Sequence, residues 1–510
     1  MAVLDHVEDV PNGINGVAQR GPPEPAAHAG NKQHLKSVAA NLREVPAYSP
    51  RRLRVVTIGA GYSGLTLAHK FQHQHPELAS IVDHTIYEAF PFDPNPDWSR
   101  FFSTGPEIWA YMKKIAQKWN LERDVKYDHR VVGAYWQEDR GQWKVNVEHE
   151  GMVIEDFADV LVSAQGFLNS WNWPSIPGLQ DFQGKKVHSA SWDHTYDYSN
   201  KRIAVIGNGS SGIQILPQMA KLEGTRVTSF QRGPTWVVST MSPASLLGKD
   251  DTSYNPEYTE DEKKRFRDEP GLHHKYRKTI IDSINDSFKM FIKNSPLNQE
   301  VLSLARTQMA EKLKHDADLC EKLIPKWELG CRRITPGEGY LESFLRPTVT
   351  LTQSPISEIR SNGVQTADQK FYEVDVGPNA LIGHGSLMES LGWSAEYMIK
   401  WIKKIAFEDI KAVVPKESAV EDFIVYSDQI HQTLTWTGAC RSWYKNNTVD
   451  GRVTATFAGS ALLFKKLIEE LRPEDFDIEP RDKNRFRFLG NGFTAYELQK
   501  GNDLAWYVEK

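Results

Sequence analysis

LRVVTIGAGYSGLTLAHK, residues 53–70, is the stretch that decides the fold. Residues 53–58, rich in apolar side chains, have the length of a buried parallel strand, and residues 65–68 open a helix. Between them stands the spacing Gly-x-Gly-x-x-Gly, which lets the backbone approach a pyrophosphate whose charge the unpaired N–H groups of the helix start can hold. The residues of this predicted nucleotide-binding turn are Gly59, Gly61, Tyr62, Ser63 and Gly64.

The same pattern occurs a second time further along the chain. Residues 201–206 predict a strand before it, and residues 213–216 predict a helix behind it. One such turn is weak evidence, because ordinary tight turns share the spacing, but two copies between a strand and a helix indicate two bound dinucleotides. The residues of the second turn are Gly207, Gly209, Ser210, Ser211 and Gly212.

The residues at the next strand end distinguish the two nucleotides. After the first turn the strand ends at Glu88, whose carboxylate can accept hydrogen bonds from both ribose hydroxyls and would repel a 2′-phosphate. After the second turn the strand ends in Gln231 and Arg232, and the guanidinium can grip a phosphate in a bidentate fork. The second site is therefore predicted to bind NADP(H) rather than NAD(H).

Composition excludes several classes of function. Hydrophobic residues make up 40% of the 510 residues, enough for a sizeable core, and the net charge of −5 offers no field for nucleic acid. Three cysteines, Cys320, Cys331 and Cys440, are too few and too scattered for a disulfide framework or a zinc site, so no metal site and a reducing compartment are predicted. The first residues lack the features of a signal peptide, and no apolar run reaches membrane-spanning length, so we predict a cytoplasmic protein.

The predicted fold class is α/β, with two doubly wound Rossmann-like domains. A duplication of this kind is typical of flavoproteins in which an NADPH domain is inserted into an FAD domain. The helices predicted inside the second domain fit simple solvated helices as well as a substrate lid, and a strand-like end is predicted at 453–457. The predicted division is a disordered tail at 1–50, the first part of the FAD-binding domain at 51–180, a linker at 181–200, the NADPH-binding domain at 201–376 with a helical insertion at about 242–326, and the FAD-domain return with the C-terminal region at 377–510.

The predicted linker contains FQGKKVHSASWD at residues 182–193. A histidine such as His188 is, by itself, more often a core or linker residue than a functional one. The whole spacing, just before a second glycine turn, resembles the fingerprint of the Baeyer–Villiger monooxygenases; related flavin monooxygenases that oxidise nitrogen or sulfur usually carry Tyr or Phe where Trp192 stands. The residues that carry the resemblance are Phe182, Gly184, His188, Trp192 and Asp193.

Other segments resemble the same family, especially its fungal members from secondary-metabolite pathways. They are residues 230–234, 330–333 and 440–444. The resemblance implies that Arg333 is the catalytic arginine near the flavin, that Arg332 lies near NADP(H), and that His188 and Trp192 act in gating. It further implies FAD and NADPH as cofactors, with O2 and a hydrophobic ketone as substrates and an ester or lactone as product.

The sequence departs from the family at two places. The segments that usually cover the flavin are absent after Ala89, and most of an interior strand is absent after Val376. Lost strand residues would leave backbone groups unpaired, and a thinner flavin cover would admit water. A catalytically impaired remnant or splice form is therefore one alternative, and an enzyme that oxidises nitrogen or sulfur is another. The identity of the ketone and the oligomeric state stay open.

Overall fold

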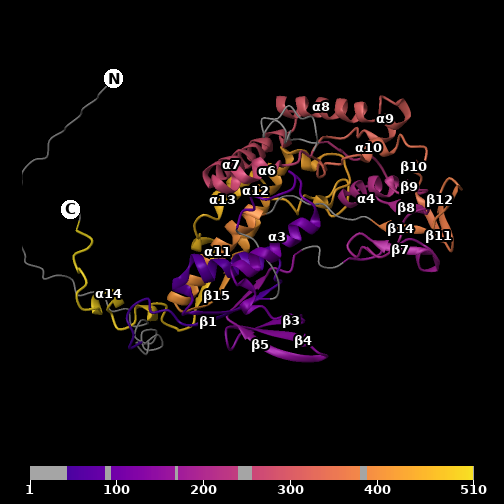
Figure 1. The fold of residues 1–510 in the computed structure, drawn as a ribbon. Helices are drawn as coiled ribbons and strands as arrows, with labels where there is room; N and C mark the ends of the chain where they lie inside the picture. Colours follow the sequence, from indigo (N-terminus) through magenta and orange to yellow (C-terminus); the bar gives the residue numbers. More distant parts are fainter. Residues whose placement is uncertain (1–42, 87–92, 167–170, 239–254, 380–387, 509–510) are drawn as a thin grey trace, which may run out of the picture. The chain divides into compact units, whose positions relative to one another are not determined.

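The computed structural model describes residues 43–86, 93–166, 171–238, 255–379 and 388–508 (Figure 1). Contacts divide the chain into two units, one formed by 1–49 with 480–510 and the other by 50–479. Within the described residues, no helix combines the length and the apolar character that crossing a membrane requires.

The first parallel sheet has β1 (Leu53–Ile58) at its centre, between β2 (Val82–Ile86) and β6 (Val160–Ser163). Val55 and Val56 of β1 are fully buried, as expected for a buried parallel strand. The helix α2 (Tyr62–His69) follows β1 directly, and this confirms the predicted strand, turn and helix.

A helix from much later in the chain covers the same sheet. α11 (Met388–Phe407) buries Ala395, Ile399 and Ile402 against residues of β1 and α2. The first sheet therefore needs the C-terminal part of the chain to complete its core.

Between β2 and β6 the chain forms a helix and an antiparallel sheet. α3 (Gly105–Lys118) is capped by the Thr104 side chain and packs Ile115 and Ala116 against α2. The sheet follows in the order β3 (Arg130–Gln137), β4 (Gln142–His149) and β5 (Met152–Ala158).

The second parallel sheet has five strands. Around it, α4 (Ser210–Lys221) packs Ile213 and Leu216 into a core that also contains the fully buried Trp236. The strand order is β10 (Val349–Thr352), β9 (Arg226–Phe230), β8 (Arg202–Ile206), β14 (Val376–Asn379) and β7 (Lys185–His188). The predicted α/β class with two dinucleotide-type sheets is confirmed, and β7 is supplied by residues predicted as linker.

Where most of an interior strand was expected to be absent, the structure has the short strand β14, and the absence of further family residues after Val376 stays a prediction. β14 lies between β8 and β7, parallel to both, with Val376 opposite Ile203 and Asn379 opposite Ile206. Four residues suffice to bridge these neighbours because each neighbouring strand is itself only four or five residues long. Pro378 has no N–H to donate, so the ladder is weakened at that residue even though the strand is present.

The described part of the segment predicted as a helical insertion contains four α-helices. α6 and α7 contribute no buried residue, whereas α8 buries Ala305 and Met309 in the core of the second sheet. A short helix, α10, follows at Tyr340–Ser343. The four helices are α6 (Glu260–Asp268), α7 (Pro270–Asp286), α8 (Pro296–Lys312) and α9 (Ala317–Leu323).

The remaining elements of the 50–479 unit are small. The predicted strand-like end at 453–457 is wrong, because these residues form an irregular segment in which the Thr454 N–H donates to the Tyr444 carbonyl (2.9 Å) and Val453 is buried. The elements are an antiparallel sheet of β11 (Ile356–Arg360), β12 (Gly363–Thr366) and β13 (Phe371–Glu373), the pair β15 (Ile410–Pro415) and β16 (Phe476–Pro480), and the helices α12 (Glu417–Gln432) and α13 (Ala461–Leu467).

The smaller unit joins the two ends of the described chain. Ala47 N–H donates to the Phe493 carbonyl (2.6 Å), and the Tyr48 ring lies 5.1 Å from the ring of Phe488. Its helix is α14 (Ala495–Leu498).

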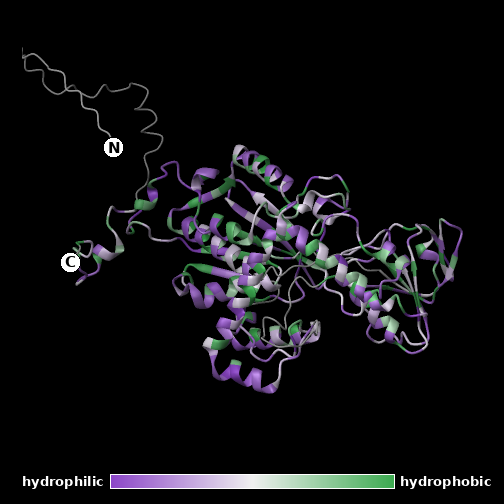
Figure 2. Cartoon of the chain, turned by 90° about the horizontal axis from the view of Figure 1, so that it is seen from above, coloured by the Kyte–Doolittle hydropathy of each residue, from purple (hydrophilic) through white to green (hydrophobic). Residues whose placement is uncertain are grey.

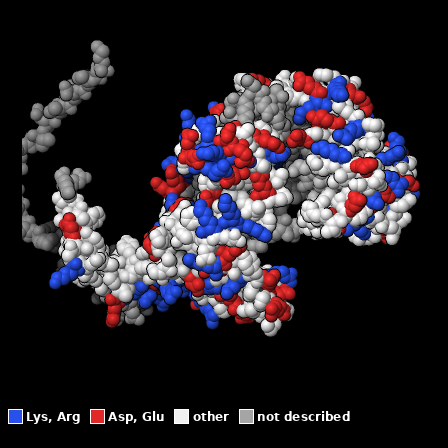
Figure 3. All heavy atoms as spheres, in the orientation of Figure 1, with Lys and Arg blue, Asp and Glu red and all other residues white. Residues whose placement is uncertain are grey.

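Hydrophobic and hydrophilic residues occupy different parts of the fold. The strands and the helix faces that pack on them are largely hydrophobic, while several peripheral helices are mainly hydrophilic (Figure 2). On the face drawn in Figure 3, basic and acidic side chains are intermixed, and no large area carries a single sign, as a net charge of −5 suggests.

Candidate active site

The first glycine turn brings β1 and β6 into close contact and leaves the start of α2 uncapped. Gly59 has φ +100°, and a Cβ atom there would lie 2.4 Å from the Ala164 carbonyl oxygen. Gly61 is the N-cap of α2, provides no side-chain cap, and is followed by no acidic residue in the first turn. The N–H groups of this turn are therefore arranged to receive an anion.

Tyr62, Ser63 and Gly64 occupy that first turn of α2, and Gly64 is buried. Burial raises the pKa of the Tyr62 phenol, and the neighbouring Tyr111 adds to the effect. Tyr62 also lines a cavity of about 260 Å³ that runs along one flank of α2 and reaches Glu389 next to α11's first residue.

Glu88 lies outside the described residues, as does the junction between Ala89 and Phe90. The structure describes β2 up to Ile86, two residues before the predicted ribose ligand. The role of Glu88 therefore stays a prediction.

The second glycine turn repeats the first. Gly207 has φ +98°, and its N–H donates to the Phe230 carbonyl at the end of β9 (2.8 Å). Gly209 is the N-cap of α4, again with no side-chain cap and no acid in the first turn. In that turn Ser210 Oγ lies 3.1 Å from Thr335 Oγ1, while Ser211 is half-buried and Gly212 is buried.

A buried amide network fixes this turn, and sequence reasoning missed it. Asn208, which stands between the two glycines, donates through Nδ2 to Gln231 Oε1 (3.0 Å) and to the Gly233 carbonyl (2.7 Å). Gln231 in turn donates to the Tyr340 hydroxyl (3.0 Å). The signal was present, because Gln231 follows the strand immediately and Asn208 lies inside the turn itself.

Three arginines gather positive charge beside this turn. Arg232 is exposed, and Arg332 and Arg333 are half-buried in the segment after α9. Burial lowers the pKa of Arg332, and the charge of Arg232 lowers it further, so these two guanidinium groups are close enough to repel. Among the described residues, the side chains whose charges shift the pKa values of Arg332 and Arg333 include tyrosines but no carboxylate.

Arg333 carries a buried nitrogen without a partner. Its Nη1 atom makes no hydrogen bond to any described residue, and burial lowers the pKa of its guanidinium while Tyr444 opposes that shift. Tyr444 interacts electrostatically with both arginines. Burial raises the pKa of its phenol, and the charges of Arg333 and Arg332 lower it. A buried donor of this kind is free to bind a ligand, and the role of Arg333 as a ligand contact stays a prediction.

In the linker segment, Phe182 and Gly184 pack as one unit. Phe182 is buried, and a Cβ atom at Gly184 would lie 2.4 Å from Phe182 Cζ and 2.5 Å from the Asp375 carbonyl oxygen. Only glycine therefore fits between the phenyl ring and the strand β14 that follows Asp375.

His188 ends β7 in an aromatic environment. Its ring stacks on Trp171 with 4.3 Å between centroids, and Trp173 meets it edge-on at 5.8 Å. Nδ1 accepts a hydrogen bond from the Ala190 N–H (3.1 Å), so the neutral ring carries its proton on Nε2, which is buried without a partner among the described residues. Burial lowers the pKa of this imidazole, and sequence reasoning did not foresee the two tryptophans.

Trp192 and Asp193 hold the linker to the second sheet. The Trp192 ring stacks on Tyr198 at 5.0 Å and packs against the core of that sheet. Asp193 forms an ion pair with Lys185 of β7 (2.6 Å), and this contact holds the pKa of its carboxyl well below the usual range.

Comparison with known proteins identifies the family. A family model described as flavin-binding monooxygenase-like matches residues 78–246. The FAD-binding monooxygenase tazF of Aspergillus terreus is 34% identical over 94% of this chain and 98% of that protein. The chain belongs to the FAD-binding monooxygenases of the Baeyer–Villiger type.

More distant relatives of this monooxygenase agree. A Baeyer–Villiger monooxygenase of Pseudomonas aeruginosa is 25% identical over 86% of this chain and 93% of that protein. Cyclohexanone monooxygenase from Rhodococcus sp. Phi1, solved with bound NADP+, shares the fold with a TM-score of 0.68 at 19% identity, over 85% of this chain and 100% of that one. The family resemblance inferred from the linker is thereby confirmed.

The comparison also bears on the missing segments. The match to tazF extends over 557 residues, which is more than the 510 of this monooxygenase. The relative therefore contains residues that have no counterpart here. Their positions after Ala89 and Val376 stay a prediction.

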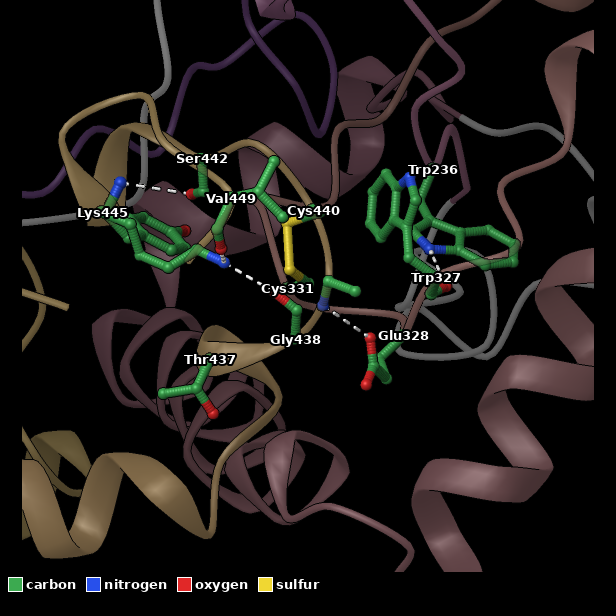
Figure 4. Close-up of a disulfide and its surroundings, with 12 residues drawn as sticks. Trp236, Trp327, Glu328, Cys331, Thr437, Gly438, Cys440, Ser442, Lys445 and Val449 are labelled. Atoms are coloured by element: carbon green, nitrogen blue, oxygen red, sulfur yellow. Dashed lines mark hydrogen bonds between the residues drawn. A yellow bond between two sulfur atoms is a disulfide. The ribbon is translucent and has the colours of Figure 1, made fainter. Parts of the chain in front are cut away.

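One expectation about this monooxygenase is wrong. Cys331 and Cys440, thought too scattered to pair, form a disulfide across 109 residues of sequence, with Cα atoms 6.2 Å apart (Figure 4). Their separation in sequence gave no indication, because the fold brings the segment after α9 against the segment after α12. The pair removes the cysteine argument for a reducing compartment, and Cys320 stays reduced.

Proposed function

We propose that this monooxygenase, with FAD as its bound cofactor, uses NADPH and O2 to insert one oxygen atom into a hydrophobic ketone. The product is an ester or a lactone. The fungal relative and the resemblance to secondary-metabolite enzymes favour a polyketide or terpenoid intermediate as substrate, in a pathway of the mycotoxin kind.

The two helix starts fit two dinucleotides. Uncapped N–H groups and the absence of first-turn acids suit the FAD pyrophosphate at α2 and the NADPH pyrophosphate at α4. In this proposal Gly59, Gly61 and Gly207 allow the close approach of backbone that each turn requires. Glu88 would hold the ribose of FAD.

Arg232 and Arg332 fit the 2′-phosphate that distinguishes NADPH from NADH. Two guanidinium groups that repel each other, one of them largely desolvated, are stabilised by a shared dianion. A bound 2′-phosphate would supply that charge.

The observation that carries the proposal is the buried, unpartnered Nη1 of Arg333. Reduced FAD, when bound, supplies the electrons that activate O2. Arg333 would place a permanent positive charge beside the oxygen that becomes anionic, and a guanidinium cannot quench that anion by donating its proton at ordinary pH. His188 and Trp192, which tie the linker to β7 and the second sheet, would position the nicotinamide rather than touch the ketone.

Single substitutions test these roles. Arg232→Ala and Arg332→Ala should each raise KM for NADPH about tenfold while leaving KM for NADH nearly unchanged, since each removes a charge-assisted contact to phosphate. Arg333→Ala should abolish oxygenated product and preserve NADP+ binding. Arg306→Ala, an exposed residue of α8, is the matched control. Equal losses with NADH and NADPH would refute the phosphate assignment.

A second candidate is a catalytically impaired remnant that still binds nucleotide. It is favoured by the residues of tazF that have no counterpart here. Purified chain should be reconstituted with FAD and given NADPH with a panel of ketones, amines and sulfides. Ester or lactone formation supports the main proposal, and oxidised amines or sulfides support an enzyme that oxidises nitrogen or sulfur. NADPH consumption that yields only hydrogen peroxide supports the remnant.

A further inference from the structure

The disulfide lies next to the proposed phosphate and catalytic arginines. Cys331 directly precedes Arg332 and Arg333. Cys440 lies four residues before Tyr444, whose phenol interacts electrostatically with both arginines. Both half-cystines are buried, with exposed fractions of 0% and 3%. The bridge therefore joins the arginine segment to the C-terminal segment at the point where the two meet.

Noncovalent contacts also join these segments. Glu328 Oε2 accepts a hydrogen bond from the Ala439 N–H at 3.3 Å, and a Cβ atom at Gly438 would lie 2.4 Å from the same oxygen (Figure 4). Gly330, with φ +92°, packs on Thr435 so closely that a Cβ atom would lie 2.8 Å from its Oγ1. These contacts align the segments but are weak compared with a covalent bond.

The C-terminal segment is itself rigid. Lys445, 1% exposed, donates through Nζ to the carbonyls of Gly438 and Val449, each at 2.6 Å. Both carbonyls belong to the loop that carries Cys440. The bridge therefore anchors the arginine segment to a fixed point rather than to a loose loop.

The arginine segment needs such an anchor. Arg332 is desolvated and repelled by Arg232, and no described carboxylate offsets either effect on Arg332. An unrestrained segment would relieve both costs by moving Arg332 towards solvent and away from Arg232. Covalent attachment of the preceding residue opposes that movement.

We propose that the Cys331–Cys440 disulfide is a positioning bridge that holds Arg332 at the 2′-phosphate of NADP(H), so that its reduction weakens NADPH binding selectively. This inference rests on the proposed function. In the reduction, an external dithiol gives two electrons and two protons to the bridge, which becomes two thiols while the dithiol becomes a disulfide. Oxidation restores the bridge and, with it, the position of the arginine.

NADP+ binding and reduction of the bridge are thermodynamically linked. A ligand that prefers the bridged protein must also protect the bridge, because coupling between two equilibria is reciprocal. NADP+ should slow reduction of the bridge by dithiothreitol several-fold. NAD+ at the same concentration should not, since it lacks the 2′-phosphate.

The test uses the full chain with Cys320→Ser, so that every thiol that appears comes from the bridge. Mass spectrometry after thiol labelling counts bridges before and after dithiothreitol, and calorimetry measures NADP+ affinity of both forms. We expect the reduced form to bind NADP+ roughly tenfold more weakly, the NADPH over NADH preference in KM to fall by a similar factor, and reoxidation to restore both. The double variant Cys331→Ser with Cys440→Ser should reproduce the reduced form.

The outcomes separate the two claims. No NADP+ binding by the bridged protein would defeat the proposed function itself. Equal NADP+ binding by bridged and reduced protein, or equal losses with NADH and NADPH, would overturn the positioning role, as would three labelled thiols in untreated protein with Cys320 intact. If the double variant does not fold, the reversible reduction of the bridged protein still decides.

Discussion

Nη1 of Arg333 and Nε2 of His188 are among several buried side-chain atoms that lack hydrogen-bond partners among the described residues. Leaving a buried donor unpaired costs about 1–3 kcal/mol, so native proteins keep few of them. Both residues belong to segments that resemble family motifs. We infer that these donors are satisfied by bound nucleotide or by the reacting oxygen, which is why they stay unpaired in the protein alone.

Asn208 allows a test of the second turn at the level of one residue. Asn208→Ala removes two hydrogen bonds and leaves Gln231 Oε1 and the Gly233 carbonyl unpaired. We expect a loss of about 1–3 kcal/mol in the free energy of unfolding and a higher KM for NADPH, with FAD content unchanged. Urea unfolding and flavin absorbance measure the two effects, and a fall in FAD content alone would contradict the assignment of this turn.

Gly184 tests the packing of the linker. Gly184→Ala would place a methyl group against Phe182 and the Asp375 carbonyl, an overpacking that costs about 1–3 kcal/mol. Gly271→Ala is the control, since a Cβ atom there meets nothing within 4 Å. Thermal unfolding should show a lower Tm for the first variant and no loss for the second; equal Tm values would mean that the linker packs differently.

At the scale of elements, patterns of neighbouring residues predicted the strands and the helix starts that depend on local sequence. β1, β8 and β9 come from stretches of strand length with buried apolar residues, and the glycines after the first two fix where α2 and α4 begin. Comparison with the family pattern predicted that most of the strand after Val376 is absent, and the four residues of β14 form a strand by pairing with β7 and β8.

The site shows the same division. The glycine turns could be found from spacing alone. The electrostatic repulsion between Arg332 and Arg232, the stacking of Trp171 on His188 and the bridge between Cys331 and Cys440 all join residues that lie apart in sequence. Only the tertiary fold reveals them.

His69 makes the α2 helix sensitive to pH. Burial, aided by the neighbouring His73, lowers the pKa of His69 to about 4, whereas an unfolded histidine has a pKa of about 6.5. Between these values the unfolded chain binds a proton that folded His69 does not, so stability falls as the pH drops through that window.

Between pH 7 and pH 5, the free energy of unfolding of the His69→Gln variant should fall by about 2 kcal/mol less than that of the parent protein. Urea unfolding at both pH values measures this difference. His194→Gln, at an exposed position of the linker, should leave the parent's pH dependence unchanged. Identical pH dependence in parent and His69→Gln protein would show that His69 titrates normally in the folded state.

At the scale of the whole molecule, the two parallel sheets have uncapped helix starts that match two nucleotides, and the sheets are linked through β7 and the linker fingerprint. β14 completes the second sheet between β8 and β7. The predicted thinner flavin cover would decide whether the oxygen activated with electrons from NADPH is transferred to a ketone or released as hydrogen peroxide.

The most direct measurement is oxygenation under ¹⁸O2. FAD-loaded protein, NADPH and a hydrophobic cyclic ketone should give a lactone that carries one ¹⁸O atom, with one NADPH consumed per lactone. Consumption of NADPH with hydrogen peroxide as the sole product, or a lactone without ¹⁸O, would contradict the account.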